Sequence, residues 1–74
     1  MERETEQNIK KSFGKRLRLL RKQKGLSQGT LALACDLDRT YIGGIERGER
    51  NIGLVNIYKI SIALGVSVKE LFDV

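Results

Sequence analysis

Apolar residues recur at helical spacing along the whole chain, and this pattern most restricts the folds that the sequence can form. Phe13, Leu17 and Leu20 are separated by four and three residues with basic residues between them. This spacing predicts an amphipathic helix over about 9–24, and Gly25 is a natural C-terminal stop for it. Residues 1–8 fit either an N-terminal arm or the start of this first helix.

Capping residues and glycines divide the remainder into four further helices. Ser27 is expected to cap a helix through about residue 34, and Asp38 a third that ends at Gly48. Gly65 ends a fourth over about 54–64, and Ser67 with the glutamate three residues on predicts a capping box that starts a short fifth. The expected inward residues are Leu31, Ala32, Ile42, Ile45, Leu54, Ile57, Ile60 and Leu64, and the last helix carries Leu71 and Phe72.

Five short helices with tight connections predict an all-α, compact five-helix bundle in one domain, residues 9–74. The 74-residue chain has no His and one Cys, which leaves Cys35 as a small buried thiol and excludes the usual zinc sites and an internal disulfide. We expect no cofactor, no metal and no enzymatic activity. Because no run of about 18 apolar residues is present, we expect a cytoplasmic protein that does not enter the membrane.

The positive charge is concentrated in the first third of the chain. The net charge is +5, and residues 1–25 hold nine basic and three acidic side chains, whereas residues 26–74 hold five and six. A basic segment on a small domain is typical of proteins that bind nucleic acid, although charge alone fits a solvated helix face equally well. Aromatic residues are few, which disfavours modules that stack bases on aromatic side chains.

Two consecutive glycines, Gly43 and Gly44, conflict with the third helix, because each costs about 1 kcal/mol relative to Ala in a helix interior. Either the helix is shorter than drawn, or its outer surface approaches something closely. We favour close approach to a ligand backbone.

The second and third helices flank a short turn at residues 35–38, and Ala32, Leu37 and Ile42 are spaced to lock them together. This is the helix-turn-helix arrangement, whose second helix lies in the DNA major groove. The sequence here resembles the phage repressor and Cro type of helix-turn-helix protein over residues 13–72. The matching segments are Leu-Ser-Gln at 26–28, Ile-Glu-Arg-Gly at 45–48 and Ala-Leu-Gly-Val-Ser-Val at 63–68. The run at 37–51 is most similar to the controller proteins of type II restriction–modification systems.

The resemblance implies a repressor-like DNA-binding domain and assigns roles to individual residues. Arg39 and Thr40 begin the third helix, where the family contacts bases, and an arginine fork suits guanine O6 and N7. Tyr41 is a further candidate for a base or phosphate, with packing against a neighbouring helix as the alternative. Gln28 is expected to contact the DNA backbone, and so is the loop after the third helix. For Arg47 in that loop, a salt-bridged surface residue is an equally good alternative. The loop residues are Arg47, Arg50 and Asn51.

Family alignment also pairs Arg21 with Glu46 as a half-buried structural salt bridge between the first and third helices. A single recognition helix contacts too few base pairs to select one site, so we expect an isologous homodimer on a pseudo-palindromic operator of double-stranded DNA. The family dimerises through its last two helices. The implied interface residues are Val55, Tyr58, Ile62, Val68, Leu71, Phe72 and Val74.

The sequence therefore predicts a dimeric transcriptional regulator, an activator or repressor of a restriction–modification operon that includes its own gene. Activation requires a contact with RNA polymerase, and no residue identifies that surface. The alternatives are a phage-type repressor, an antitoxin-like autoregulator, or a protein-interaction module that no longer binds DNA.

Overall fold

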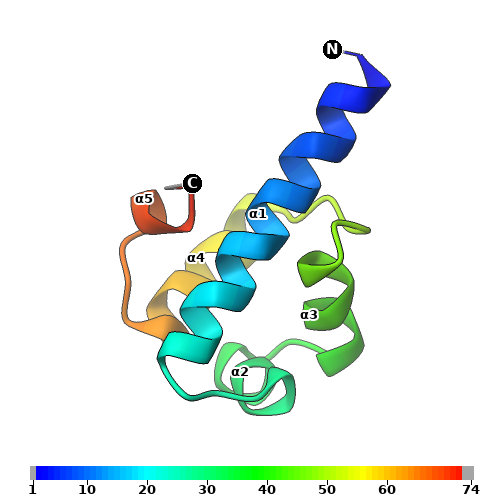
Figure 1. The fold of residues 1–74 in the computed structure, drawn as a ribbon. Helices are drawn as coiled ribbons and strands as arrows, with labels where there is room; N and C mark the ends of the chain where they lie inside the picture. The colour runs from blue at the N-terminus through cyan, green and yellow to red at the C-terminus, as the bar shows by residue number, and fades with distance from the viewer. Residues whose placement is uncertain (1, 73–74) are drawn as a thin grey trace.

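The computed structural model describes residues 2–72, which form five α-helices and no strand (Figure 1). The all-α prediction is confirmed. In order, the helices are α1 (Arg3–Gln23), α2 (Gln28–Cys35), α3 (Arg39–Glu46), α4 (Leu54–Leu64) and α5 (Val68–Leu71). Helix α1 runs through the middle of the molecule, with α3 on one side of it and α4 and α5 on the other (Figure 1).

The core contains side chains from all five helices. Helices α1 and α2 each supply three of its side chains, and α3 contributes two isoleucines that are almost completely buried. A helix of eight residues is too short to be stable alone, so α3 depends on this packing for its position. The buried core residues are Phe13, Leu17, Leu20, Leu31, Ala32, Cys35, Ile42, Ile45, Ile60, Leu64 and Leu71.

Local capping fixes where the helices begin and end. The Ser27 hydroxyl accepts a hydrogen bond from the amide three residues on, and Asp38 accepts one from the amide two residues on at 2.7 Å. At the start of α5, Ser67 and Glu70 form both hydrogen bonds of a capping box. Three glycines follow helices with the positive φ angles that favour glycine: Gly25, Gly48 and Gly65.

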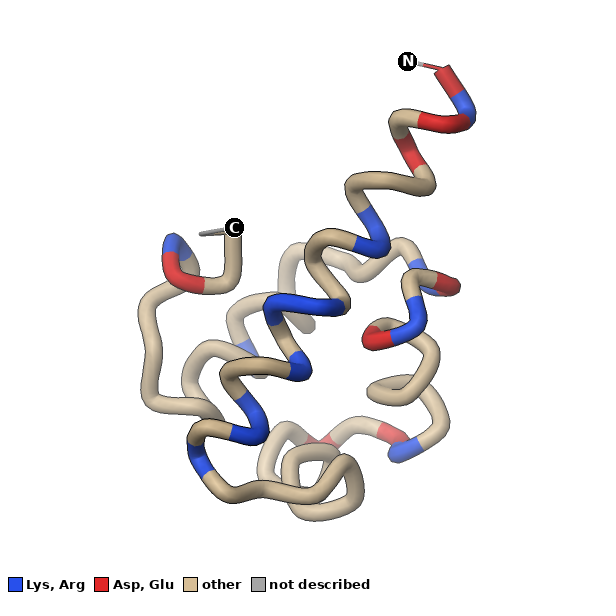
Figure 2. The backbone as a smooth tube through the Cα atoms, in the orientation of Figure 1, with Lys and Arg blue, Asp and Glu red and all other residues tan. Residues whose placement is uncertain are grey.

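Helix α1 begins at Arg3, so of the two alternatives that the sequence left open, residues 3–8 form the start of the first helix and not an arm. Its first turns extend beyond the rest of the molecule (Figure 1) and their side chains are exposed. Acidic residues lie in this first turn and basic residues follow along the helix (Figure 2), a distribution that the helix dipole favours.

Helices α1 and α3 approach so closely that only a glycine fits at position 14. A Cβ atom there would lie 2.6 Å from the carbonyl oxygen of Glu46 and closer still to that of Ile45. Gly14 therefore sets the distance between the two helices. The sequence pattern did not single it out.

Two expectations about apolar residues are wrong. Leu71 is fully buried, because α5 folds back against α1 and α4, so it is a core residue and is unavailable to a second copy. Leu54 is 69% exposed. The inward stripe of α4 begins at the half-buried Ile57, because the first turn of α4 extends past the packed core.

Candidate nucleic-acid interface

The turn between α2 and α3 leaves the first residues of α3 exposed. Asp36 adopts the left-handed conformation after α2, and the Leu37 amide donates to the carbonyl of Ala32 at 2.9 Å, which closes the turn. Arg39 and Thr40 follow directly and are both exposed. Their side chains are therefore available to a ligand at the N-terminus of α3.

The N-termini of α2 and α3 form one continuous surface. The Cδ of Arg39 lies 3.7 Å from the position that a Cβ on Gly29 would occupy, in ordinary van der Waals contact. Gln28, the preceding residue, is partly buried and also borders α3. The structure thus brings together Gln28 and Arg39, which the sequence singled out separately.

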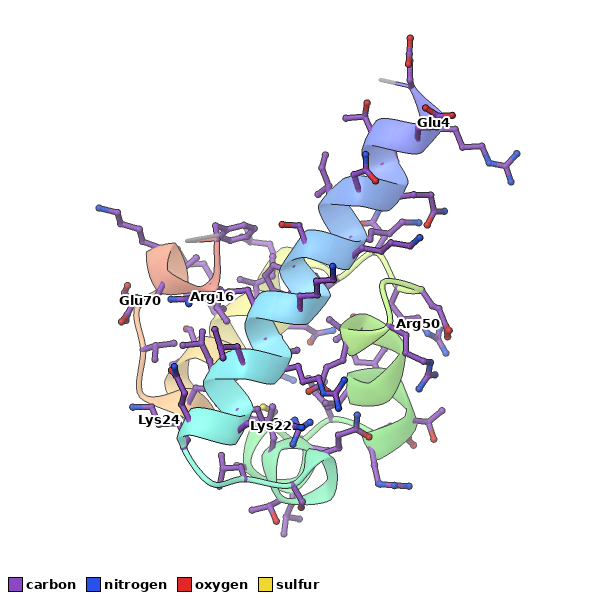
Figure 3. The ribbon with its side chains drawn as sticks, in the orientation of Figure 1. Glu4, Arg16, Lys22, Lys24, Arg50 and Glu70 are labelled. Carbon is purple, nitrogen blue, oxygen red and sulfur yellow. The ribbon has the colours of Figure 1, made fainter. Side chains whose placement is uncertain are left out.

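Tyr41 lies at the edge of this surface rather than fully on it. It is half-buried and packs against the core, and its hydroxyl accepts a hydrogen bond from Asn56 of α4 at 3.3 Å. The Arg50 guanidinium lies over its ring at 5.8 Å, within cation–π range. In Figure 3, Arg50 lies beside α3, on the opposite side of α1 from Arg16 and Glu70.

Helix α3 runs through both Gly43 and Gly44, so the shorter-helix explanation is wrong. The preferred explanation, close approach to a ligand backbone, also needs correction, because side chains of the chain itself cover both glycines. A Cβ on Gly43 would meet Arg47 Nη1 at 3.1 Å, and one on Gly44 would meet Arg50 Cγ at 3.0 Å. The glycines give room for two arginine side chains to lie back across the helix.

A buried polar network joins α1, α2 and α3. Arg21 donates through Nε and Nη2 to the two carboxylate oxygens of Glu46, at 2.6 and 3.0 Å, and through Nη1 to the carbonyl of Leu26 at 2.8 Å. The hydrogen bond to Glu46 raises the pKa of the Arg21 guanidinium. Gln28 donates to the same carboxylate at 3.1 Å, a contact that the sequence analysis did not anticipate. Glu46 therefore holds both the angle between helices and the side chain of Gln28.

The loop after α3 carries a second, exposed ion pair. Arg47 donates through Nε and Nη2 to the two carboxylate oxygens of Glu49, at 2.9 and 3.2 Å. These hydrogen bonds raise the pKa of Arg47 and lower the pKa of Glu49. The sequence left Arg47 open between a phosphate contact and a salt bridge, and it gave no role to Glu49. The only signal for this ion pair in the sequence is that the two opposite charges lie two residues apart. Asn51 is exposed further along the loop.

Apolar side chains are exposed on α4 and α5, away from this surface. Val55, Tyr58, Ile62 and Phe72 are 52–77% exposed. Val68 is half-buried, and Val74 lies outside the described residues. The centroids of the Phe72 and Phe13 rings lie 5.2 Å apart.

The chemistry that the described residues offer is that of a binding surface. Burial raises the pKa of the Cys35 thiol, which makes it a poor nucleophile. Residues 2–72 contain no group of three or more potential metal-ligating side chains. Within the same range no helix has the length and apolar character needed to cross a bilayer.

Comparison with known proteins identifies close relatives. A family model described as helix-turn-helix, HTH_3, matches residues 17–71. The chain is 53% identical over 67 residues to control protein C.MunI of Mycoplasma sp, covering 89% of this chain and 90% of that protein. It is 55% identical over 67 residues to control protein C.BamHI of Bacillus amyloliquefaciens, covering 89% and 83%.

Among solved structures, the restriction-modification controller protein C.AhdI from Aeromonas hydrophila superimposes with a TM-score of 0.83 and 58% sequence identity. The match covers 84% of this chain and 94% of that one. The resemblance inferred from the sequence is thus confirmed.

Proposed function

Because this chain belongs to the helix-turn-helix family HTH_3 and is a DNA-binding transcription regulator rather than an enzyme, we propose that it controls a restriction–modification operon. In this proposal it acts in the cytoplasm as a homodimer on a pseudo-palindromic operator, regulates its own gene and activates through a contact with RNA polymerase. The observation that carries the proposal is the exposed N-terminus of α3, with Arg39 and Thr40 free of burial, in a chain similar to controller proteins.

We assign base contacts to Arg39, Thr40 and Tyr41. Residues at the start of the recognition helix reach base edges in the major groove, where an arginine fork can bond both acceptors of guanine. Thr40 can bond a base edge or press its methyl group on thymine. Because the Tyr41 hydroxyl already accepts from Asn56, we expect it to donate its own proton to DNA.

We assign backbone contacts to Gln28, Arg50 and Asn51. The free amides at the N-terminus of α2 favour a phosphate, and Gln28 begins that helix. Its Nε2 has two protons, and only one is needed for the hydrogen bond to Glu46. Arg50 and Asn51 lie in the loop after α3, and both are exposed.

The dimer of the proposal forms through α4 and α5. Val55, Tyr58 and Ile62 are spaced by three and four residues, so they share one face of α4, and all three are exposed together with Phe72. Val68 borders them. An isologous contact between such faces gives two recognition helices related by a two-fold axis, and the half-sites then lie about 34 Å apart.

Selection of bound sites from a random DNA library with the purified protein tests the proposal. We expect one pseudo-palindromic site with two half-sites, also present upstream of the gene itself. A gel shift on that promoter should give nanomolar affinity that falls steeply with salt. Enrichment of no sequence, or of a single half-site without symmetry, would contradict the proposal.

A further inference from the structure

The outward face of α3 has a position without a side chain, Gly43, and the side chain of Arg47, the residue directly after the helix, lies over it. Gly43 lies one helical turn after Arg39 and therefore on the same side of α3. The nearest atom to a Cβ on Gly43 would be Arg47 Nη1 at 3.1 Å, and the next would be Gln28 Oε1 at 3.4 Å. The guanidinium of Arg47 thus stands where the side chain of a second-turn residue would stand.

Glu49 fixes the orientation of this guanidinium. Its two carboxylate oxygens accept from Nε and Nη2 of Arg47, which are two of the three nitrogens. The hydrogen bonds to Glu49 do not use the two protons of Nη1 or the second proton of Nη2. One proton of Nη1 and one of Nη2 point in parallel from the adjacent edge of the planar group, whose Nη1 lies beside Gly43.

On the premise of the DNA binding proposed above, we propose that Arg47 contacts a guanine in the major groove and that Glu49 is the residue that positions it. The edge formed by Nη1 and Nη2 offers two parallel donors, which match O6 and N7 of guanine. This makes Arg47 a specificity-determining residue beside Arg39, at a base pair farther along the groove. It replaces the backbone contact that the sequence suggested for Arg47.

A base edge suits this arginine better than a phosphate does. Arg47 and Glu49 are both exposed, with 58% of each side chain accessible, and together they carry no net charge. A phosphate beside the pair would be repelled by the Glu49 carboxylate and would gain little from an already neutralised cation. A guanine edge is uncharged and needs only directed donors, which the pair supplies.

Glycine at position 43 is part of the same arrangement. A Cβ there would lie 3.1 Å from Nη1, which is shorter than nine in ten contact distances of Cβ atoms in proteins. The guanidinium would therefore have to move by a few tenths of an ångström. Gln28 restricts the other side, because its amide is held by Glu46 at 3.1 Å. The Gly43→Ala variant should therefore shift Arg47 without removing it.

The test uses the operator selected by the wild-type protein and single-base variants of it. The wild-type protein should prefer guanine at one symmetry-related position by roughly 5–150-fold, the range that a bidentate pair supplies. Replacing that guanine with 7-deazaguanine, which lacks the N7 acceptor, should weaken wild-type binding. Arg47→Lys keeps the charge but loses the planar fork, so it should reduce both the preference and the 7-deazaguanine penalty while retaining the salt dependence.

The Glu49→Gln variant should reduce the preference at the same position and raise affinity for unrelated duplexes. Glu6→Gln, which removes an exposed negative charge from the first turns of α1, is the matched control and should leave the base preference unchanged. An equal 7-deazaguanine penalty in wild type and Arg47→Lys would overturn the base contact. A full preference in Glu49→Gln would overturn the positioning role. If the wild-type protein selected no sequence at all, the proposed function itself would fail, which is a different result from either of these.

Discussion

Within residues 2–72, the arginine–glutamate pair Arg21–Glu46 is buried and the pair Arg47–Glu49 is exposed, and breaking each should have very different effects on stability. Arg21 and Glu46 are 7% and 9% exposed, and each Arg21 nitrogen donates a hydrogen bond. The Arg21→Met variant keeps the apolar volume but leaves the Glu46 carboxylate buried with Gln28 as its remaining side-chain donor.

Removing one partner of a buried pair costs about 3–5 kcal/mol, because the other charge stays uncompensated. At about 0.05–0.15 kcal/mol per residue, a chain of 74 residues has about 4–11 kcal/mol of stability in total. The Arg21→Met variant should therefore lose a large fraction of it. With a urea m-value of about 1–2 kcal/mol/M for a domain of this size, the unfolding midpoint should fall by roughly 1.5–5 M.

The assay is urea unfolding followed by circular dichroism, with all variants at one protein concentration because a dimer of the kind proposed contributes to apparent stability. The matched control is Arg47→Met, which breaks the exposed pair with Glu49 and should leave the midpoint unchanged. A double variant, Arg21→Met with Glu46→Leu, removes the stranded charge and should recover most of the loss. Equal midpoints for the Arg21 and Arg47 variants, or no recovery in the double variant, would refute this account of the buried pair.

Three further predictions concern the fold, the DNA contacts and the dimer. The Gly14→Ala variant should be destabilised by about 1–3 kcal/mol despite its better helix propensity, because its Cβ meets backbone of α3; Gly29→Ala, where a Cβ makes only ordinary contacts, should be neutral or more stable in the same urea assay. In gel shifts, Arg39→Ala should bind operator and scrambled duplexes alike with a nearly unchanged salt slope, whereas Arg50→Ala should weaken both and reduce the slope by about 0.9. The Ile62→Glu variant places a charge at a 77% exposed position, so it should fold normally but sediment as a monomer; an unchanged dimer would exclude this face of α4.

The bounds of α2 to α5 were predictable because local signals determine them. Ser27, Asp38 and Ser67 cap helices through hydrogen bonds that span two or three residues, and Gly65 ends α4 in a conformation that glycine favours. Such signals depend on neighbours in sequence. The helix bounds that they determine can therefore be predicted without knowledge of the tertiary packing.

The features that the sequence left undetermined depend on contacts between distant residues. The exposure of Leu54 and the burial of Leu71 depend on where the other helices lie. The helical spacing of apolar residues does not distinguish the two positions. The need for glycine at position 14 comes from the carbonyl groups of α3, which are about 30 residues away in sequence. The hydrogen bond between Gln28 and Glu46 likewise joins two helices and leaves no local signal.

These distant contacts also explain how α3, with only eight residues, is held as firmly as the proposed base contacts require. Gly14 sets how close α3 lies to α1, and the Arg21–Glu46 pair fixes the end of α3 against both α1 and α2. Both groups are buried, so neither is available to DNA, yet a shift in either would displace Arg39 from the base contact that we propose. Base discrimination should therefore be lost by two separable routes: without loss of stability when Arg39 is replaced, and together with stability when the buried network is broken.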